Sequence, residues 1–497
     1  MNIEEELAIY PENKLSIRSH YYNVSVNKQE IFVEEMAKYD VPVHYVRFAF
    51  TGTAQLEVSA DREIKSYILS PKSKEIKLEC DGENIKFKLT EPGSYVLKIN
   101  TMEYLFIFAD PIRMNEIKEE TANVKNIRDY GIDNTGEKVQ TRNIQRAINQ
   151  ISSSNKYDTL YFPSGIYCTG TIELKSNITL YLTEDAIICG SDYPNDYPDL
   201  FELTGDNSLQ NKNSLLYSYN AKNVSIKGRG TIDGNGKSIK YQGISANLLK
   251  IIGSKEISIE GIFLRDPANW NTHIFKSENV SVKNVKVINN IPFVNWSNTD
   301  GIDCDCSRNI VIEDSFLYCG DDCFVIKGTE QENGQNVEDI VINNNVCISS
   351  CAALKIGTET VAREIKGIEF SDINIVFARR GMVIDGFDYA EIDNVAFKNI
   401  RIEQLNDGPG IEKTLIIEIN IPEKTWRPCP GECKINNLYF KDIVVDVTHP
   451  SSITGRNDKY KVKDLLIKNF YIDGKKITNG EDGNIKFNEY VEGVKFE

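Results

Sequence analysis

A short pattern of alternating apolar and polar residues recurs along the chain. One copy reads Asn223-Val224-Ser225-Ile226-Lys227-Gly228, with apolar residues at every second position and a turn-forming residue at its end. Further copies start 33, 23, 30 and 30 residues after one another, at residues 256–261, 279–284, 309–314 and 339–344. Variants of the pattern follow at residues 367–373, 394–400, 437–443 and 464–470. Alternation of this period is typical of a half-buried strand, and a strand that recurs once per coil predicts a solenoid.

The length of the coils indicates the kind of solenoid. Coils of 23 to 33 residues without long amphipathic helices favour an all-β, right-handed parallel β-helix over leucine-rich or helical repeats. Strands of successive coils would stack about 4.8 Å apart, so that equivalent residues form ladders and one outer face becomes a long groove. Residues 143–151 place their apolar side chains on one helical face, and we expect this helix to cap the first coil.

The N-terminal part of the chain has a different pattern. Residues 17–110 contain no repeat of coil length, but they do contain short alternating stretches separated by turn residues. These stretches are residues 46–50, 55–58, 75–80, 85–89 and 95–99. They predict a small β-sandwich, followed by a linker near residue 120. We therefore expect an N-terminal domain with its linker at residues 1–120 and the β-helix at residues 121–497.

Composition and charge restrict the classes of partner. The chain has 497 residues, of which 41% are hydrophobic, and a formal net charge of −16. That charge disfavours nucleic acid and anionic membranes as partners. The acidic start of the chain lacks the features of a secretory signal, and no apolar run reaches the length of a membrane span. We expect a cytoplasmic protein, or a secreted one if a signal segment has been removed, and the oligomeric state stays open.

Three aspartates set about one coil apart are the main candidate for chemistry. Asp300 follows Asn298-Thr299, and Asp321 and Asp322 are adjacent in Gly320-Asp321-Asp322-Cys323. Hydrolysis of a glycosidic bond needs one carboxyl group to protonate the leaving oxygen and another to activate water. Crowded carboxylates repel one another, so the pKa of one rises and that group can stay protonated near neutral pH. Such a site requires neither a metal nor a cofactor.

Several segments together resemble glycoside hydrolase family 28, the polygalacturonase-like enzymes. They are residues 126–131, 161–167 and 228–236, the segment Asn269-Trp270-Asn271-Thr272-His273, and the two aspartate segments. The resemblance implies a pectin-lyase-like solenoid and a glycosidase that cleaves an oligosaccharide or polysaccharide with inversion. It also implies that Asp321 is the general acid and that Asp300 and Asp322 hold and activate water.

Two motifs of the family are replaced in this chain. Cys351-Ala352-Ala353 stands where the resemblance implies Gly-His-Gly, and Val383-Ile384-Asp385 stands where it implies Arg-Ile-Lys. The missing cations would bind the carboxylate of a uronic acid, so we expect a substrate other than simple polygalacturonate. Lys355 and Arg380 are candidates to compensate. His273, Trp270, Glu359 and Asp385 are further candidates for contact with substrate, and Trp296 and Trp426 for stacking on sugar rings.

Other interpretations of the same residues remain open. A β-helix lyase or epimerase would need a base together with cations or calcium, and a carbohydrate-binding protein would have lost catalysis. The eleven cysteines include two Cys-x₃-Cys spacings, at Cys319/Cys323 and Cys347/Cys351, that would suit a metal. Stacked coils, however, align small apolar residues in the interior, and we expect buried, reduced cysteines. Cys429 and Cys433 would form a local disulfide if the protein were exported.

Overall fold

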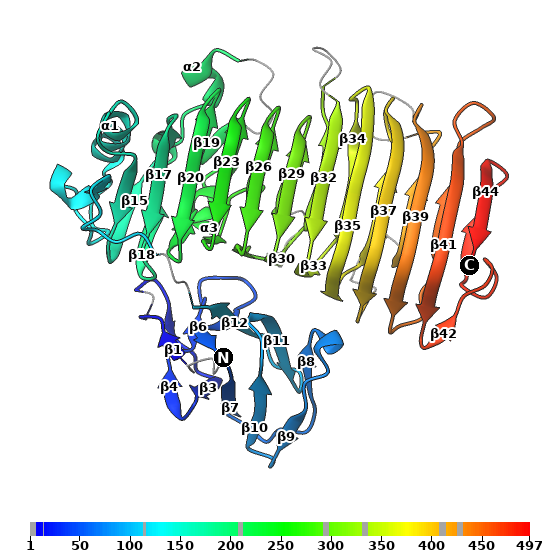
Figure 1. Ribbon diagram of the computed structural model, residues 1–497, viewed down its shortest axis with the longest axis horizontal. Coiled ribbons are helices and arrows are strands. Elements are labelled where there is room, and N and C mark those ends of the chain that lie inside the picture. Colours follow the sequence, from blue (N-terminus) through cyan, green and yellow to red (C-terminus); the bar gives the residue numbers. More distant parts are fainter. Residues whose placement is uncertain are drawn as a thin grey trace.

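A computed structural model describes residues 6–12, 14–112, 116–206, 212–291, 298–330, 336–406, 414–424 and 431–497. The chain forms a long solenoid of parallel strands, with a smaller group of sheets packed below its N-terminal half in the view of Figure 1. This arrangement confirms the predicted right-handed parallel β-helix with an N-terminal β-sandwich.

Two sheets wind along the solenoid. The sheet that will be called the groove sheet contains β16 (Ile172–Leu174), β19 (Asn213–Tyr219), β22 (Ala246–Ile252), β25 (Thr272–Phe275), β28 (Ile302–Asp305), β31 (Phe324–Gly328), β34 (Ala352–Thr360), β36 (Arg380–Asp385), β38 (Leu415–Asn420), β40 (Ser451–Thr454) and β43 (Ile485–Phe487). All pairings between its successive strands are parallel, as single strands contributed by successive coils must be.

The other sheet takes two strands from most coils, and these merge into one long strand in the later coils. It contains β13 (Val124–Asn126), β14 (Thr159–Phe162), β15 (Gly165–Thr169), β17 (Ile178–Leu182), β18 (Ala186–Gly190), β20 (Lys222–Gly228), β21 (Thr231–Asp233), β23 (Lys255–Glu260), β24 (Phe263–Arg265), β26 (Glu278–Lys283), β27 (Lys286–Ile288), β29 (Arg308–Glu313), β30 (Phe316–Cys319), β32 (Val337–Asn343), β33 (Val346–Ser349), β35 (Glu364–Phe377), β37 (Glu391–Ile402), β39 (Lys434–Val445), β41 (Val462–Ile472), β42 (Lys475–Lys476) and β44 (Val491–Phe496). Every copy of the repeated pattern lies in this sheet.

The alternation in the sequence becomes a set of buried ladders. Val224 pairs with Ile257, and the same column continues through Val280 and Ile310 to Leu465. A second column, two residues further along each strand, contains stacked rings, with Phe370 and Phe397 5.0 Å apart and Phe397 and Phe440 5.1 Å apart. The apolar positions point inward because successive residues of a strand face opposite sides of the sheet.

The turn residues of the repeat are also stacked. Asn279, Asn309 and Asn394 begin their copies with φ of 57°, 54° and 54°, a left-handed conformation that asparagine tolerates. The Asn309 amide donates to the side-chain oxygen of Asn279 one coil earlier, at 3.2 Å. The repeated asparagine therefore turns the backbone and also bonds one coil to the next.

Three short helices lie between strands of the solenoid in the described part of the chain. They are α1 (Thr141–Ser152), α2 (Leu200–Thr204) and α3 (Gly236–Tyr241). The α1 helix buries Ile144, Ala147, Ile148 and Ile151 in the solenoid core and covers its N-terminal end, as predicted. Leu200 of α2 packs against Tyr217 and Phe275 on the outer side of the groove sheet.

The N-terminal residues form two sheets around a core of their own. One contains β1 (Glu6–Ile9), β2 (Ile17–Arg18), β5 (Glu34–Glu35), β6 (His44–Thr51), β8 (Tyr67–Ser70), β11 (Gly93–Ile99) and β12 (Leu105–Pro111). The other contains β3 (Tyr22–Val26), β4 (Gln29–Ile31), β7 (Ala54–Ala60), β9 (Leu78–Cys80) and β10 (Asn84–Leu89). The expected strand at residues 75–80 is shorter, because Glu75 adopts a left-handed conformation after a 3₁₀ turn. We propose residue 120 as the domain boundary, because it lies between β12 and β13.

The N-terminal sheets dock on the outer side of the short strands that precede the groove sheet. Phe106 lies 4.9 Å from Phe316 and 5.2 Å from Tyr318, measured between ring centroids. Charged groups lie beside this apolar contact: the buried Lys286 donates to Asp110, and the half-buried Lys38 lies 3.0 Å from the buried carboxylate of Asp233. A contact that combines aromatic packing with buried ion pairs holds the two parts in one orientation.

Membrane-spanning helices and cysteines can be assessed over the residues that the structure describes. No helix found there is long and apolar enough to cross a membrane. Ten cysteines are free thiols in this part of the chain, and Cys304, Cys319, Cys323 and Cys347 are buried in the solenoid core, as predicted. Cys429, with the disulfide considered for it, lies outside the described residues, as do Trp296 and Trp426.

The docking contact predicts a stability effect. Phe106→Ala removes a fully buried ring that packs against Phe316 and Tyr318 of the solenoid and should lower the free energy of unfolding by about 3–5 kcal/mol. Guanidinium denaturation followed by fluorescence measures this change. Tyr439→Ala, at an exposed position of β39, is the control and should change stability by less than about 0.5 kcal/mol. Equal effects of the two substitutions would contradict the importance of the contact.

Candidate active site

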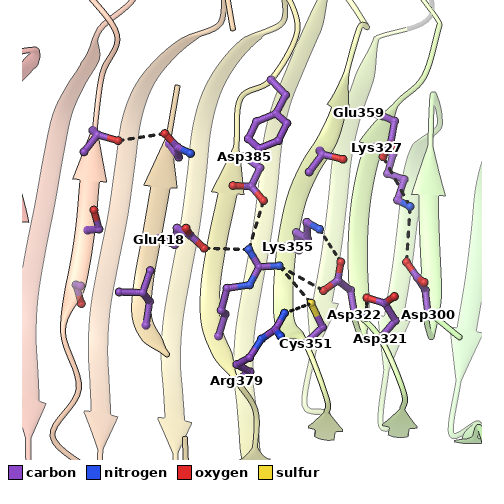
Figure 2. Close-up of a pocket in the computed structure, with 18 of the residues that line it drawn as sticks. Asp300, Asp321, Asp322, Lys327, Cys351, Lys355, Glu359, Arg379, Asp385 and Glu418 are labelled. Carbon is purple, nitrogen blue, oxygen red and sulfur yellow. Dashed lines mark hydrogen bonds and ion pairs between the residues drawn. The ribbon is translucent and has the colours of Figure 1, made fainter. Parts of the chain in front are cut away.

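A cavity of about 910 Å³ follows the corner at which successive coils enter the groove sheet. Its lining includes Trp270, Asn298, Asp300, Asp321, Asp322, Lys327, Cys351, Lys355, Glu359, Arg379, Arg380, Asp385, Leu415, Glu418, Asn420, Pro450, Ser451, Ser452, Thr454 and Lys486. Figure 2 shows that carboxylates and cations alternate along it, from Asp300 on one side to Glu418 on the other. The cavity therefore combines the groove expected of a β-helix with a concentration of charge.

Stacking of coils brings the three predicted aspartates together. Asp300 lies two residues before the strand β28, and Asp321 and Asp322 precede β31 on the next coil. The backbone N–H of Gly301 donates to the carbonyl of Asp322 at 2.9 Å, which sets the register of the two corners. Aspartates about twenty residues apart in sequence are thus neighbours in space.

Asp322 is held in its ionised form. Its carboxylate accepts a hydrogen bond from the Lys355 amine at 2.7 Å and one from the backbone N–H of Ala352 at 2.8 Å, with Arg380 4.0 Å away. Burial opposes ionisation, but Lys355 and Arg380 outweigh it and hold the pKa of Asp322 well below its usual range. Asp322 can therefore accept a proton or hold water as a carboxylate.

Asp321 has the opposite tendency. Burial, and then the negative charge of Asp322, raise the pKa of Asp321, although Lys355 and Lys327 oppose the rise. One oxygen of its side chain accepts from the backbone N–H of Asp322 at 3.0 Å. Two adjacent aspartates are thus driven to different protonation states, which is the division that acid and base roles require.

Asp300 completes the group from the coil before. Its carboxylate is buried, lies 3.7 Å from the Lys327 amine, and has a pKa raised first by burial and then by Asp303 and Asp321. Lys327 is shared, because it also lies 3.0 Å from Asp303 and 3.8 Å from Glu359. Burial raises the pKa of Asp303 to about 7, although Lys327 opposes the rise.

The residues considered for compensating cations are already engaged with carboxylates. Lys355 lines the cavity, but its amine is bonded to Asp322. Arg380 lies 2.9 Å from Glu418 and 3.6 Å from Asp385, and burial raises the pKa of Asp385 to about 6. Glu359 and Asp385 also line the cavity. Contact of any of these residues with substrate stays a prediction.

The two aromatic candidates differ in access. Trp270 lines the cavity, and the Lys327 amine lies 3.6 Å from the centroid of its ring. His273 is 1% exposed, packs edge-on against Trp270, and bonds through Nε2 to Asp305 at 3.1 Å. The structure does not place His273 at the cavity surface, because its strand points it into a buried polar layer. Burial lowers its pKa to about 4, so its ring is neutral near neutral pH.

Asp321, Asp322 and Cys351 form a group whose ligand atoms lie within 4.8 Å of one another, close enough for a metal ion. The donor chemistry does not fit a metal. Asp322 is bonded to Lys355, and the Cys351 sulfur accepts from Arg379 and from Arg380, each at 3.3 Å. The positive charges of Lys355, Arg379 and Arg380 already bond to these oxygen and sulfur atoms, and they would repel a divalent metal ion.

Sequence reasoning did not single out Lys327, Arg379 and Glu418. Glu418 pairs in register with Val383, and Val383 pairs with Lys355. Glu418 therefore shares one outward column of the groove sheet with Val383 and Lys355. The alternating pattern of residues 415–420 was a signal for this strand. Loops of different lengths precede the groove strands. The spacing of the repeated pattern therefore does not show which residues of successive groove strands lie side by side.

The profile of "Glycosyl hydrolases family 28" matches residues 156–488, more than half of the chain and the whole of the cavity lining. The chain belongs to family 28 of the glycosyl hydrolases. A probable polygalacturonase of Vitis vinifera is 29% identical over 278 residues, which cover 52% of this chain and 55% of the relative. An exo-poly-alpha-D-galacturonosidase of Dickeya chrysanthemi is 26% identical, with 57% of each chain covered. This family 28 chain thus spans little more than half the length of these two relatives.

Solved structures of the family have the same fold. A family 28 exopolygalacturonase of Yersinia enterocolitica superposes with a TM-score of 0.60 over 89% of this chain and 96% of its own, at 17% identity. An exopolygalacturonase of Thermotoga maritima superposes with a TM-score of 0.56 over 78% of this chain and 94% of its own, at 20% identity. At such identities the likeness shows the β-helix fold and leaves the substrate open.

The ion pair between Lys355 and Asp322 predicts a measurable titration. Because Lys355 lowers the pKa of Asp322, Lys355→Met should move that pKa upward, and Asp322 would then take up its proton at a higher pH than in the unchanged protein. Carbon NMR of aspartate-labelled protein measures the midpoint directly. Lys355→Arg keeps the charge and should shift it far less. An unchanged midpoint in Lys355→Met would contradict the assigned cause.

Proposed function

We propose that this family 28 protein is an inverting glycoside hydrolase that cleaves a polysaccharide or oligosaccharide chain in the cavity around Asp321. The observation that carries the proposal is the different bonding of two adjacent carboxyl groups: Asp322 accepts from Lys355 and from the N–H of Ala352, whereas Asp321 accepts from the N–H of Asp322. These surroundings displace the two pKa values in opposite directions, upward for Asp321 and downward for Asp322. A raised pKa suits a general acid, and a lowered pKa suits a carboxylate that holds water.

In the proposed mechanism, Asp321 donates its proton to the oxygen of the departing sugar. Asp322 and Asp300 hold a water molecule on the opposite face of the ring, and Asp322, whose pKa is lowered, accepts the water proton as the new bond forms. Lys355 keeps Asp322 ionised, and Lys327 balances the charge around Asp300. The bond to the leaving oxygen breaks and one water is consumed, which yields the inverted anomer.

The polar groups around the aspartates favour a substrate other than simple polygalacturonate. Acidic Asp385 occupies a place where the family resemblance implies a cation, and Arg380 beside it is paired with Glu418. A uronic acid at the scissile bond would meet these carboxylates, whereas hydroxyl groups of a neutral sugar can donate to them. We therefore propose that a neutral sugar lies beside the scissile bond. The relatives named as polygalacturonases supply the competing substrate for the test.

The lyase alternative has less support. Abstraction of a proton next to a uronate carboxylate needs cations that neutralise that carboxylate. Lys327, Lys355 and Arg380 each lie within 4.0 Å of Asp300 or Asp322, and each is within 3.0 Å of a protein carboxylate. A binding protein without catalysis would not need the divided pKa values of Asp321 and Asp322.

Substitution of the acid tests the catalytic proposal. Asp321→Asn should lower the turnover of a cleaved glycan by about 10²–10⁴-fold, because the leaving oxygen loses its proton donor. Release of reducing ends measures turnover, and proton NMR of the first product reports the anomer. Asp129→Asn, at a more exposed carboxylate far from the cavity, is the control. Unchanged turnover in Asp321→Asn, or unsaturated products that absorb ultraviolet light, would exclude the mechanism.

A comparison of substrates tests the sugar beside the scissile bond. Chains of alternating uronic acid and neutral sugar should be cleaved with a higher kcat/KM than polygalacturonate of the same length. The same enzyme preparation and buffer serve for both series, so the ratio reports transition-state contacts. A preference for polygalacturonate would show that the acidic groups near Arg380 do not exclude a uronate.

A further inference from the structure

The cavity continues well beyond the three aspartates. Its lining reaches Lys486 on β43, near the C-terminal end of the solenoid, and includes Asn420, Ser452 and Thr454 on the way. These residues lie on the same groove sheet as the catalytic corner, in later coils. Nothing in the proposed chemistry uses this end of the cavity.

Strand register gives the distance between the two ends. Lys355, Val383, Glu418, Ser452 and Lys486 pair in succession from β34 to β43 and form one column. Four steps of about 4.8 Å place Lys486 about 19 Å from Lys355 along the solenoid axis. A sugar unit lengthens a glycan chain by a similar step, so Lys486 lies about four sugar units from the carboxylates.

The charge of Lys486 is not balanced by the protein. Lys355 is paired with Asp322, and Arg380, the next cation along the cavity, lies 2.9 Å from Glu418. Lys486 is exposed and forms no ion pair within the part of the chain that the structure describes. In a chain with a net charge of −16, a cation left without a carboxylate inside the substrate cavity is available to an anionic ligand.

The groups beside Lys486 suit a sugar rather than a small ion. Ser452 is its partner in register, and the Thr454 hydroxyl donates to the Asn420 side chain at 3.2 Å. Hydroxyl and amide groups at neighbouring steps can exchange hydrogen bonds with sugar hydroxyls. Pro450 and Leu415 add apolar surface to the same wall.

We propose that Lys486, Ser452 and Asn420 form a distant subsite that binds an acidic sugar about four units from the scissile bond. This inference rests on the proposed function, because the same glycan chain would occupy both ends of the cavity. It also separates two demands on the substrate: a neutral sugar at the point of cleavage and a carboxylate farther along the chain. The specificity of the protein would then be for a mixed chain.

The test measures binding to the Asp321→Asn variant, so that cleavage cannot remove the ligand. Pectic oligosaccharides of alternating uronic acid and neutral sugar, of increasing length, are compared by calorimetry with the same chains after reduction of their carboxyl groups. Long acidic chains should bind about tenfold more tightly than reduced chains, and added salt should diminish the difference. Chains too short to reach Lys486 should bind equally in both forms.

Lys486→Gln in the same background should abolish the difference for long chains, and Lys486→Arg should keep it. Lys495→Gln, at an exposed lysine of β44 in the other sheet, is the matched control and should have no effect. Equal affinity of acidic and reduced chains, no binding of either, or no effect of Lys486→Gln would overturn the subsite. Binding that depends on Lys486 in a protein that cleaves no chain would contradict only the proposed function.

Discussion

Backbone hydrogen bonds between stacked coils hold equivalent residues about 4.8 Å apart, and the other features of this protein depend on that repetition. Each inward residue packs against the residue at the equivalent position of the next coil, which gives the aliphatic ladders and the stacked rings of Phe370, Phe397 and Phe440. Outward positions of the groove sheet are repeated in the same way. A polar residue on one coil therefore always has a defined neighbour on the next, and a linear substrate can follow the column.

The same repetition brings charges close together at the catalytic corner. Asp300, Asp321 and Asp322 come from two successive coils, and such a cluster of buried carboxylates is unfavourable by itself. Lys327 and Lys355, on the outward side of the following strands, offset this charge at 3.7 Å and 2.7 Å. Because Lys355 acts most strongly on Asp322, the compensation is unequal, and the two adjacent aspartates acquire different proton affinities.

The docked N-terminal domain also contacts the backbone segment that leads to this corner. Tyr39 donates to the backbone carbonyl of Ile288, and Asp40 accepts from Lys237 on α3. Asn289, the residue after Ile288, donates to the carbonyls of Thr299 and Asp300. The N-terminal domain is thus connected to the backbone of Asp300 through two short links. Its aromatic contact with the solenoid supports the geometry of the site as well as stability.

The sequence alone determined the strands, the coils and the convergence of the aspartates, since alternation and coil length are local properties that stacking converts into neighbours. Helix α1 and the buried cysteines were predictable for the same reason. Only the tertiary structure decided that Lys355 binds Asp322, that His273 is buried against Asp305, and that Lys486 lies in the cavity. These facts depend on which groove strands become neighbours, and loops of unequal length between the repeats hide that pairing from the linear pattern.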